Sequence, residues 1–225
     1  KTAFIGHPEA FNPAYDSPRR PDPAGPKHLV LLPGSRRSEI RHILPPMLAA
    51  LGGLQDRHPG LTASIPTLPP LAAGIEAACA ASPVAGDVSI DSGDGALFSS
   101  LARGNAVLAA SGTVTLQTAL YGVPGVACYV APPLSAFIGR RLVRMDRVIL
   151  PNALLERDVY PFLFQEAATP AAMMAALDKV LGDDGARRRS AGHAAALRDM
   201  LRGGSDRFGD GVVSALTEWF GPPPS

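Results

Sequence analysis

The sequence has few cysteines and almost no net charge, and each shortage excludes a class of protein. Its two cysteines, Cys79 and Cys128, have neither the spacing of zinc ligands nor that of a redox pair. We therefore expect two reduced, buried thiols and no bound metal. The net charge of +1 is too small for a protein whose main partner is nucleic acid.

A second shortage is local, because residues 105–139 contain no Asp, Glu, Lys or Arg. Hydroxyl and amide side chains interrupt the first half of this stretch and prolines interrupt the second, so no apolar run of about 20 residues is left to span a membrane. A buried succession of strand, helix and strand explains the missing charge better. The chain starts at Lys1 with no signal-like segment after it, and we expect it to be part of a longer protein.

Proline, by contrast, is concentrated near the start of the chain, at positions 13, 18, 21, 23 and 26. Such a segment can neither pair in a sheet nor continue a helix, so residues 12–27 indicate a linker. The preceding residues predict a short strand that ends at Gly6-His7-Pro8. Residues 1–26 are therefore expected to be the end of a preceding domain and a linker.

From residue 28 onward, apolar strands alternate with helices. Segments rich in Val, Ile, Leu and Ala predict five strands, at residues 28–33, 61–67, 87–91, 105–110 and 125–130. A helix is predicted after each of the first four, and Pro45 and Pro46 are expected to kink or restart the first of them. Buried strands joined by helices predict an α/β fold, with a Rossmann-like domain over residues 27–182 in which helices cover both faces of a parallel sheet.

The remainder of the chain predicts mainly helices. Residues 133–152 predict a helix and then a short strand, and residues 186–220 predict two helices broken at Gly203-Gly204. Residues 183–225 are therefore expected to form a set of C-terminal helices after the domain.

A glycine turn with two cations follows the first predicted strand. In an open parallel sheet, ligands bind beyond the carboxyl ends of the strands, where the next helix offers unpaired N–H groups. Gly34 would let an anion approach, Ser35 would donate a hydroxyl, and Arg36 would bind phosphate oxygens in a bidentate manner. Glu39 suits the first turn of the helix that follows. A plain turn with solvated arginines is the alternative.

A second turn of the same build follows the fourth predicted strand. Ser111, Gly112 and Thr113 lead into a helix, so the two strand ends could bracket a diphosphate. Gln117 lies one turn after Thr113 on the same side of that helix. On its own, Gln117 is better explained as a surface or capping side chain than as a ligand contact.

Together these residues resemble a family. The sequence is similar to the carboxyl-terminal half of lipid-A-disaccharide synthases, glycosyltransferases with two Rossmann domains in the GT-B arrangement. The matching motifs follow the family's order and are FIGHP at 4–8, LLPGSRRSEI at 31–40, LAASGTVTLQTAL at 108–120, PPLSAFIGRRLV at 132–143 and ILPNALLERDVYPFLFQE at 149–166.

The resemblance implies a function in lipid A biosynthesis. The family transfers 2,3-diacylglucosamine from its UDP-sugar donor to 2,3-diacylglucosamine 1-phosphate and releases UDP, without a metal or other cofactor, at the cytoplasmic face of the inner membrane. Its carboxyl-terminal half holds UDP, and this chain would be that half. By the same resemblance, Arg36 and Ser111-Gly112-Thr113 lie on the diphosphate side and Asn152 belongs to a Leu-Pro-Asn loop of the donor site.

The chain departs from the family at several positions. Gln117 replaces a Glu that grips ribose hydroxyls in related enzymes, and an amide makes weaker bonds there than a carboxylate. Asn105 replaces an Asp, Val130 a basic residue, and Leu155-Glu156 an Ala-Gly pair. These changes leave open whether the chain uses the same sugar or retains activity.

The residue expected to act as the base in the family would precede Lys1. His7 is the nearest candidate for acid and base chemistry in this chain, although a lone histidine is more often a hydrogen-bonded structural residue. We expect that the chain alone does not catalyse transfer.

A basic stretch bears on location. Arg140, Arg141, Arg144 and Arg147 have near-helical spacing with apolar residues between them, as in a helix that lies on an anionic bilayer. A solvated helix face is the alternative.

The last helix of such enzymes commonly crosses onto the first domain, so we expect its apolar residues to be exposed and to cause self-association: Val212, Val213, Leu216, Trp219 and Phe220.

Two further functions stay open. One is a non-catalytic module for nucleotide binding or membrane docking that derives from such an enzyme, which the substitutions at 105, 117 and 130 favour. The other is a different UDP-sugar enzyme of the same architecture, such as a UDP-N-acetylglucosamine epimerase.

Overall fold

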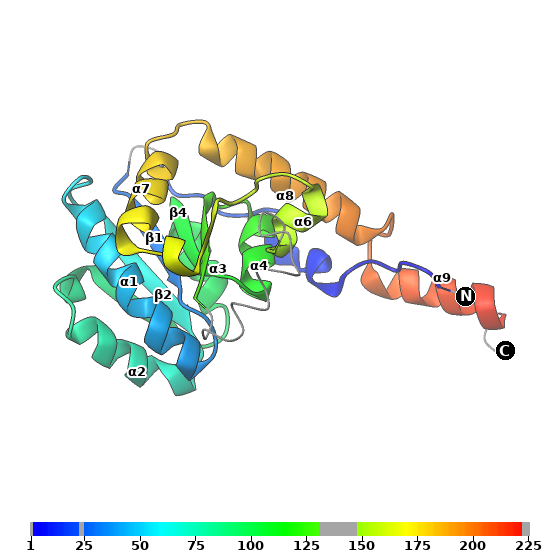
Figure 1. Cartoon of the computed structure of the whole chain (residues 1–225). Coiled ribbons are helices and arrows are strands. Elements are labelled where there is room, and N and C mark those ends of the chain that lie inside the picture. The colour runs from blue at the N-terminus through cyan, green and yellow to red at the C-terminus, as the bar shows by residue number, and fades with distance from the viewer. Residues whose placement is uncertain (1, 23–24, 131–147, 222–225) are drawn as a thin grey trace.

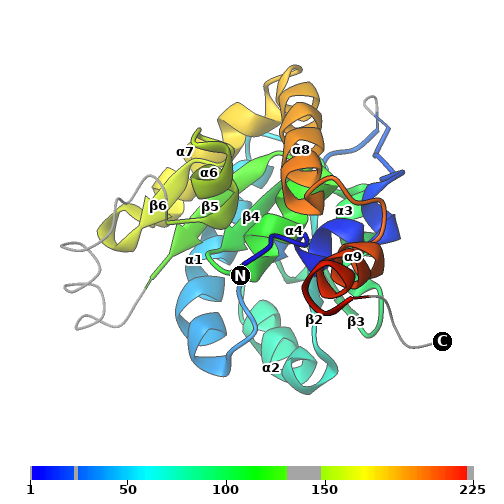
Figure 2. The same cartoon turned by 90° about the vertical axis from the view of Figure 1, so that its right-hand side faces the viewer.

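The computed structural model describes residues 2–22, 25–130 and 148–221, which form a parallel sheet with helices on both faces (Figures 1 and 2). All pairs in the six-stranded sheet are parallel, in the order β3-β2-β1-β4-β5-β6. This is the strand order of dinucleotide-binding Rossmann domains. The strands are β1 His28–Leu32, β2 Thr62–Thr67, β3 Val88–Ser92, β4 Ala106–Ala110, β5 Gly125–Tyr129 and β6 Phe162–Phe164.

Helices connect the strands and close the sheet on each side. The helices are α1 Arg37–Gln55, α2 Pro69–Ala80, α3 Ala96–Arg103, α4 Thr113–Tyr121, α6 Leu150–Leu155, α7 Pro170–Leu181, α8 Ala186–Arg202 and α9 Phe208–Phe220. Alternate residues of one strand serve the two faces: Leu29 and Leu31 pack with α1, α2 and α7, while Val30 and Leu32 pack with α3, α4 and α8. This two-sided core is why the strands are apolar without alternation.

The predicted α/β fold is confirmed, and all five predicted strands are present within one or two residues of the expected bounds. The break at Gly203-Gly204 is also confirmed, between α8 and α9. Both cysteines are free and buried, and burial raises the pKa of the Cys128 thiol to about 12. Within the described residues, no helix is long and apolar enough to cross a membrane.

Local predictions differ from the structure at three places. Among the described residues before Pro8 no strand forms, and a 3-10 helix covers Pro8–Phe11, in which His7 Nδ1 accepts the Glu9 N–H and Pro8 occupies the first turn. The first helix does not restart at Pro45 and Pro46, since α1 runs through both while its apolar face stays buried; a kink there stays a prediction. Of residues 133–152 the structure describes 148–152, where α6 starts at Leu150 with Pro151 in its first turn and takes the place of the expected strand; the helix expected before it lies outside the described residues.

The segment before β1 packs against the domain. Tyr15, which lies within the expected linker, is fully buried beside α4 and α8. The His7 N–H donates to the Leu201 carbonyl at 2.7 Å, and Arg202 donates to the Ala10 carbonyl at 3.1 Å. Residues 7–15 therefore share a core with α8. The division at residues 26 and 182 stays a prediction.

The last helix, α9, extends away from the body beside the N-terminal segment (Figures 1 and 2). Phe208 at its start packs edge-on against Phe11, with ring centroids 5.8 Å apart. Val213, Leu216 and Phe220 are exposed by 62%, 48% and 80%, whereas Val212 and Trp219 are half-buried. The expected apolar exposure on this helix is therefore found at three of the five positions.

Candidate functional site

The main cavity lies at the carboxyl ends of the strands, where strand order changes direction between β1 and β4. It has a volume of about 570 Å³, and the loops after β1, β2, β3 and β4 all contribute to its wall. Open parallel sheets bind their ligands at this point, because the two neighbouring connections leave in opposite directions and open a crevice. The Gly-Ser-Arg turn and the Ser-Gly-Thr turn face the same cavity.

The Gly-Ser-Arg turn is built around a carboxylate. Gly34 has a φ of +108°, and a Cβ added there would lie 2.6 Å from Glu39 Oε2. Only glycine fits both the backbone angle and the close approach of this side chain. The other carboxylate oxygen, Oε1, accepts a hydrogen bond from Arg36 Nη1 at 2.7 Å, and the Arg36 side chain is 77% exposed.

The Ser-Gly-Thr turn is more open. Among the described residues, no atom lies within 4 Å of a Cβ added at Gly112, and the extended φ of 166° does not require glycine. Gly112 is the N-cap of α4, and its carbonyl accepts the Thr115 hydroxyl at 2.7 Å. The space above this turn is therefore available to a ligand. Gln117 is half-buried and also lines the cavity, as do Ser35, Ser111 and Thr113.

Besides α2, which begins beside the cavity with two prolines that carry no N–H, three helices begin at this cavity. The N-cap residues of α1, α3 and α4 are Arg36, Gly95 and Gly112, and within the described residues none of the three caps its helix through a side chain. The Ala96 N–H of α3 donates to the Gly93 carbonyl and the Thr115 N–H of α4 donates to the Gly112 carbonyl, and the remaining first-turn N–H groups need other partners. Helix N-termini with this property bind anions well.

One loop of the cavity is absent from the sequence-based site. Gly93 and Gly95 follow β3 with φ of +108° and +79°, and Asp94 between them and Leu97 and Phe98 beyond them line the cavity. The signal was present, since two glycines follow the third predicted strand. Parallel strands bring their carboxyl ends together, so this loop could have been included.

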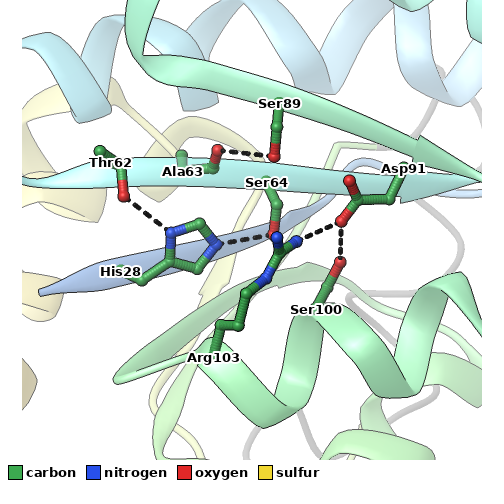
Figure 3. A network of polar contacts seen from close by, with 8 residues as sticks. All are labelled: His28, Thr62, Ala63, Ser64, Ser89, Asp91, Ser100 and Arg103. Atoms are coloured by element: carbon green, nitrogen blue, oxygen red, sulfur yellow. Dashed lines mark hydrogen bonds and ion pairs between the residues drawn. The ribbon is translucent and has the colours of Figure 1, made fainter. Parts of the chain in front are cut away.

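A polar network fixes the helix that carries this loop (Figure 3). Asp91 of β3 accepts a hydrogen bond from Ser100 of α3 at 2.8 Å and forms an ion pair with Arg103. Next to it, the two ring nitrogens of His28 contact the hydroxyls of Thr62 and Ser64, each at 2.8 Å. Three strands and α3 are thereby connected by side-chain contacts.

The same network sets the charge state of His28. Burial lowers the pKa of the His28 imidazole, and the nearby Arg103 guanidinium lowers it further, while Asp91 acts in the opposite direction. The neutral ring is therefore the stable form in the folded protein.

Asn152 lies elsewhere. It is 2% exposed, and its Oδ1 accepts the N–H groups of Val159 and Tyr160 at 3.1 and 3.0 Å. Its Nδ2 donates to the Tyr160 carbonyl at 2.9 Å. Asn152 therefore holds the segment after α6, and among the described residues it is not part of the cavity wall.

His7 is likewise outside the cavity wall as the structure describes it, because it is exposed and caps the first 3-10 helix. The four arginines of the basic stretch, at 140, 141, 144 and 147, lie outside the described residues.

Solved structures with this fold include glycosyltransferases and a putative UDP-N-acetylglucosamine 2-epimerase from Listeria monocytogenes, which matches with a TM-score of 0.59 and 13% identity over 97% of this chain and 54% of that chain. The calicheamicin glycosyltransferase CalG4 matches with a TM-score of 0.56 and 19% identity, over 97% of this chain and 52% of that chain. WaaG, a glycosyltransferase involved in lipopolysaccharide biosynthesis, matches with a TM-score of 0.53 and 17% identity, over 88% of this chain and 48% of that chain. The fold is that of one half of the GT-B architecture.

The sequence comparisons identify a family and are therefore more specific than the fold. Residues 1–204 match the family model of the lipid-A-disaccharide synthetases. Lipid-A-disaccharide synthase of Nitrobacter winogradskyi is 38% identical over 96% of this chain and 56% of its own length, and that of Bordetella parapertussis is 37% identical over 88% and 55%. The chain belongs to the lipid-A-disaccharide synthetase family and spans about half the length of the curated relatives that it matches.

Proposed function

We propose that this chain is the donor-binding half of a glycosyltransferase of lipid A biosynthesis. The complete enzyme would transfer 2,3-diacylglucosamine from UDP-2,3-diacylglucosamine to 2,3-diacylglucosamine 1-phosphate and release UDP. Family membership supports the reaction. The observation that carries the site assignment is the cavity in which an arginine turn and an open helix N-terminus face each other.

The roles follow from charge and geometry. The α4 N-terminus, with Ser111 and Thr113 beside it, would receive the diphosphate, and Arg36 would bind phosphate oxygens from the opposite wall. Ser35 would add a hydroxyl donor, and Gln117 would bind ribose hydroxyls. These groups hold the donor without a metal or other cofactor.

The acceptor site and the base would come from the half that precedes residue 1 in the relatives. His7 stays the weak candidate within this chain, and its Nδ1 already accepts the Glu9 N–H, which leaves Nε2 for any proton transfer. We retain residues 27–182 as the donor domain, with residues 183–225 as helices that pack on it.

Calorimetric titration with UDP tests the donor site, with Arg36→Ala as the variant and Arg37→Ala as its matched control. Arg37 directly follows Arg36 in the chain, is exposed to solvent and does not line the cavity. Loss of a charged hydrogen bond should weaken UDP binding by about 1.5 kcal/mol or more in Arg36→Ala, roughly tenfold. Arg37→Ala should bind as the unaltered chain does; equal losses in both would indicate a general charge effect and contradict the assignment.

Gln117 favours a second candidate function. It lines the cavity at the position where the family resemblance calls for Glu, so a non-catalytic nucleotide-binding module is the main alternative. Transfer by the complete protein would exclude it. A UDP-N-acetylglucosamine epimerase would be detected by incubating the protein with that sugar nucleotide and analysing the products.

We also propose a location at the cytoplasmic face of the inner membrane. The acylated substrates of the family reaction and the arginines of residues 140–147 support attachment to an anionic surface. Binding to vesicles that contain anionic lipid, compared with neutral vesicles, tests this attachment.

A further inference from the structure

The turns at Gly34 and Gly112 differ in what lies next to the glycine. In the part of the chain that the structure describes, no atom lies within 4 Å of a Cβ added at Gly112. Above Gly34 the space is filled by the Glu39 carboxylate, whose Oε2 lies 2.6 Å from the position of an added Cβ. The place where a phosphate could approach the Gly34 backbone therefore already holds an anionic group of this chain.

The same Glu39 carboxylate also forms an ion pair with Arg36, a positively charged residue of the site. Glu39 Oε1 accepts a hydrogen bond from Arg36 Nη1 at 2.7 Å, so a phosphate that binds Arg36 has to compete with this carboxylate. Glu39 is partly shielded, with its side chain 23% exposed, whereas Arg36 is 77% exposed. The carboxylate has a fixed place against the turn, and the guanidinium can leave it for solvent or ligand.

The charged residues that line the cavity also disfavour the binding of a simple anion. Its charged lining residues, among those described, are Arg36, Glu39 and Asp94, which give one positive and two negative charges. A simple anion would gain Arg36 but would have to displace Glu39 and approach Asp94. A ligand with further contacts, at the α4 N-terminus and along the apolar wall, has additional binding energy for this exchange.

We infer that Glu39 is a specificity-determining residue, whose carboxylate takes the place of a phosphate at Gly34 and Arg36 and thereby excludes inorganic phosphate while admitting a nucleoside diphosphate. The inference rests on the proposed donor site and adds selectivity to it. A neutral side chain of the same shape at position 39 should release Arg36 and make the cavity a general anion site.

The test is calorimetric titration of the 225-residue chain with UDP, with and without 10 mM inorganic phosphate, on the unaltered chain and on Glu39→Gln. Removing one negative charge from the cavity should tighten UDP binding about three- to tenfold. Phosphate should then compete with UDP in Glu39→Gln and leave the unaltered chain nearly unaffected. Glu39→Ala should behave in the same direction.

Two controls separate this effect from others. Glu76→Gln makes the same change of net charge on the exposed surface of α2, away from the cavity, and should bind UDP as the unaltered chain does. In the Arg36→Ala background, Glu39→Gln should tighten binding less than it does in the unaltered chain, because a negative charge is still removed but no cation is released. Unchanged melting temperatures show that each variant is folded.

The outcomes distinguish the two proposals. UDP binding that depends on Arg36 but is unchanged or weakened by Glu39→Gln would overturn this inference and leave the donor site standing. Lack of UDP binding by the unaltered chain and by Glu39→Gln alike would overturn both.

Discussion

Gly34 is a residue at which two requirements coincide, because its φ is positive and the Glu39 carboxylate lies directly against it. The sequence predicted a turn at this point from the apolar strand before it and the helix after it. It also placed Arg36 and Ser111-Gly112-Thr113 at one end of the sheet, which the structure brings into one cavity. The contact between Glu39 and Gly34 could not be predicted, since it depends on the rotamer that a side chain adopts in the folded turn.

Asn152 shows the opposite case. A motif resemblance assigned it to donor binding, but the structure uses its amide to satisfy three backbone groups of the segment after α6. Sequence pattern does not reveal whether a polar residue faces a ligand or pairs with buried backbone.

A prediction at this scale concerns His28. Because burial and Arg103 lower its pKa below the unfolded value of about 6.5, the unfolded chain binds the proton more readily. The contribution of His28 to stability is therefore present above that pH and is lost as the pH falls below it. The free energy of unfolding, from urea denaturation at pH 7.5 and 5.5, should fall less in His28→Asn than in the unaltered chain.

His42→Asn is the matched control, because His42 is exposed on α1. The slope measured in His42→Asn shows what the loss of an imidazole outside this network does, and the effect of His28→Asn is judged against it. Since burial lowers the pKa of His193 in the same direction, part of the slope should persist in His28→Asn. An identical slope in His28→Asn and the unaltered chain would contradict the account of this network.

At the scale of elements, the strands were predictable because buried parallel strands are continuous apolar runs. β6 and α7 were not identified, since β6 has only three residues and its aromatic side chains remain half-buried. α1 continues through two prolines because burial of its apolar face outweighs the local cost of the missing N–H groups. Tertiary packing, which a single sequence does not display, decides such cases.

Helix α6 and the segment after it depend on Asn152. Replacing Asn152 with Ala would leave two buried N–H groups and one carbonyl without this partner, at a cost of about 2–4 kcal/mol. Urea denaturation should show this loss of stability. UDP affinity should change little while the protein stays folded, whereas a large drop in affinity with intact stability would restore Asn152 to the donor site.

At the scale of the whole molecule, the chain has a hydrophobic core on each face of the sheet, and its last helix, α9, has exposed apolar side chains. The exposed apolar residues Val213, Leu216 and Phe220 on α9 would be unusual on a complete monomer. In an isolated chain of this length they predict self-association.

Sedimentation velocity across concentration tests this prediction. The unaltered chain should form larger species as concentration rises, and the double variant Leu216→Glu with Phe220→Glu should remain a monomer because the added charges oppose association. Ser214→Glu is a control on an exposed polar position of the same helix and should still associate. A monomeric unaltered chain at every concentration would contradict the prediction.

The central claim is that the cavity at the ends of β1 and β4 holds a nucleoside diphosphate, and amide chemical-shift mapping during a UDP titration tests it most directly. The account predicts saturable shifts concentrated at Gly34, Ser35, Gly112 and Thr113, with the amides around Asn152 nearly unchanged. Shifts that gather elsewhere on the molecule, with these four amides unaffected at saturation, would contradict it.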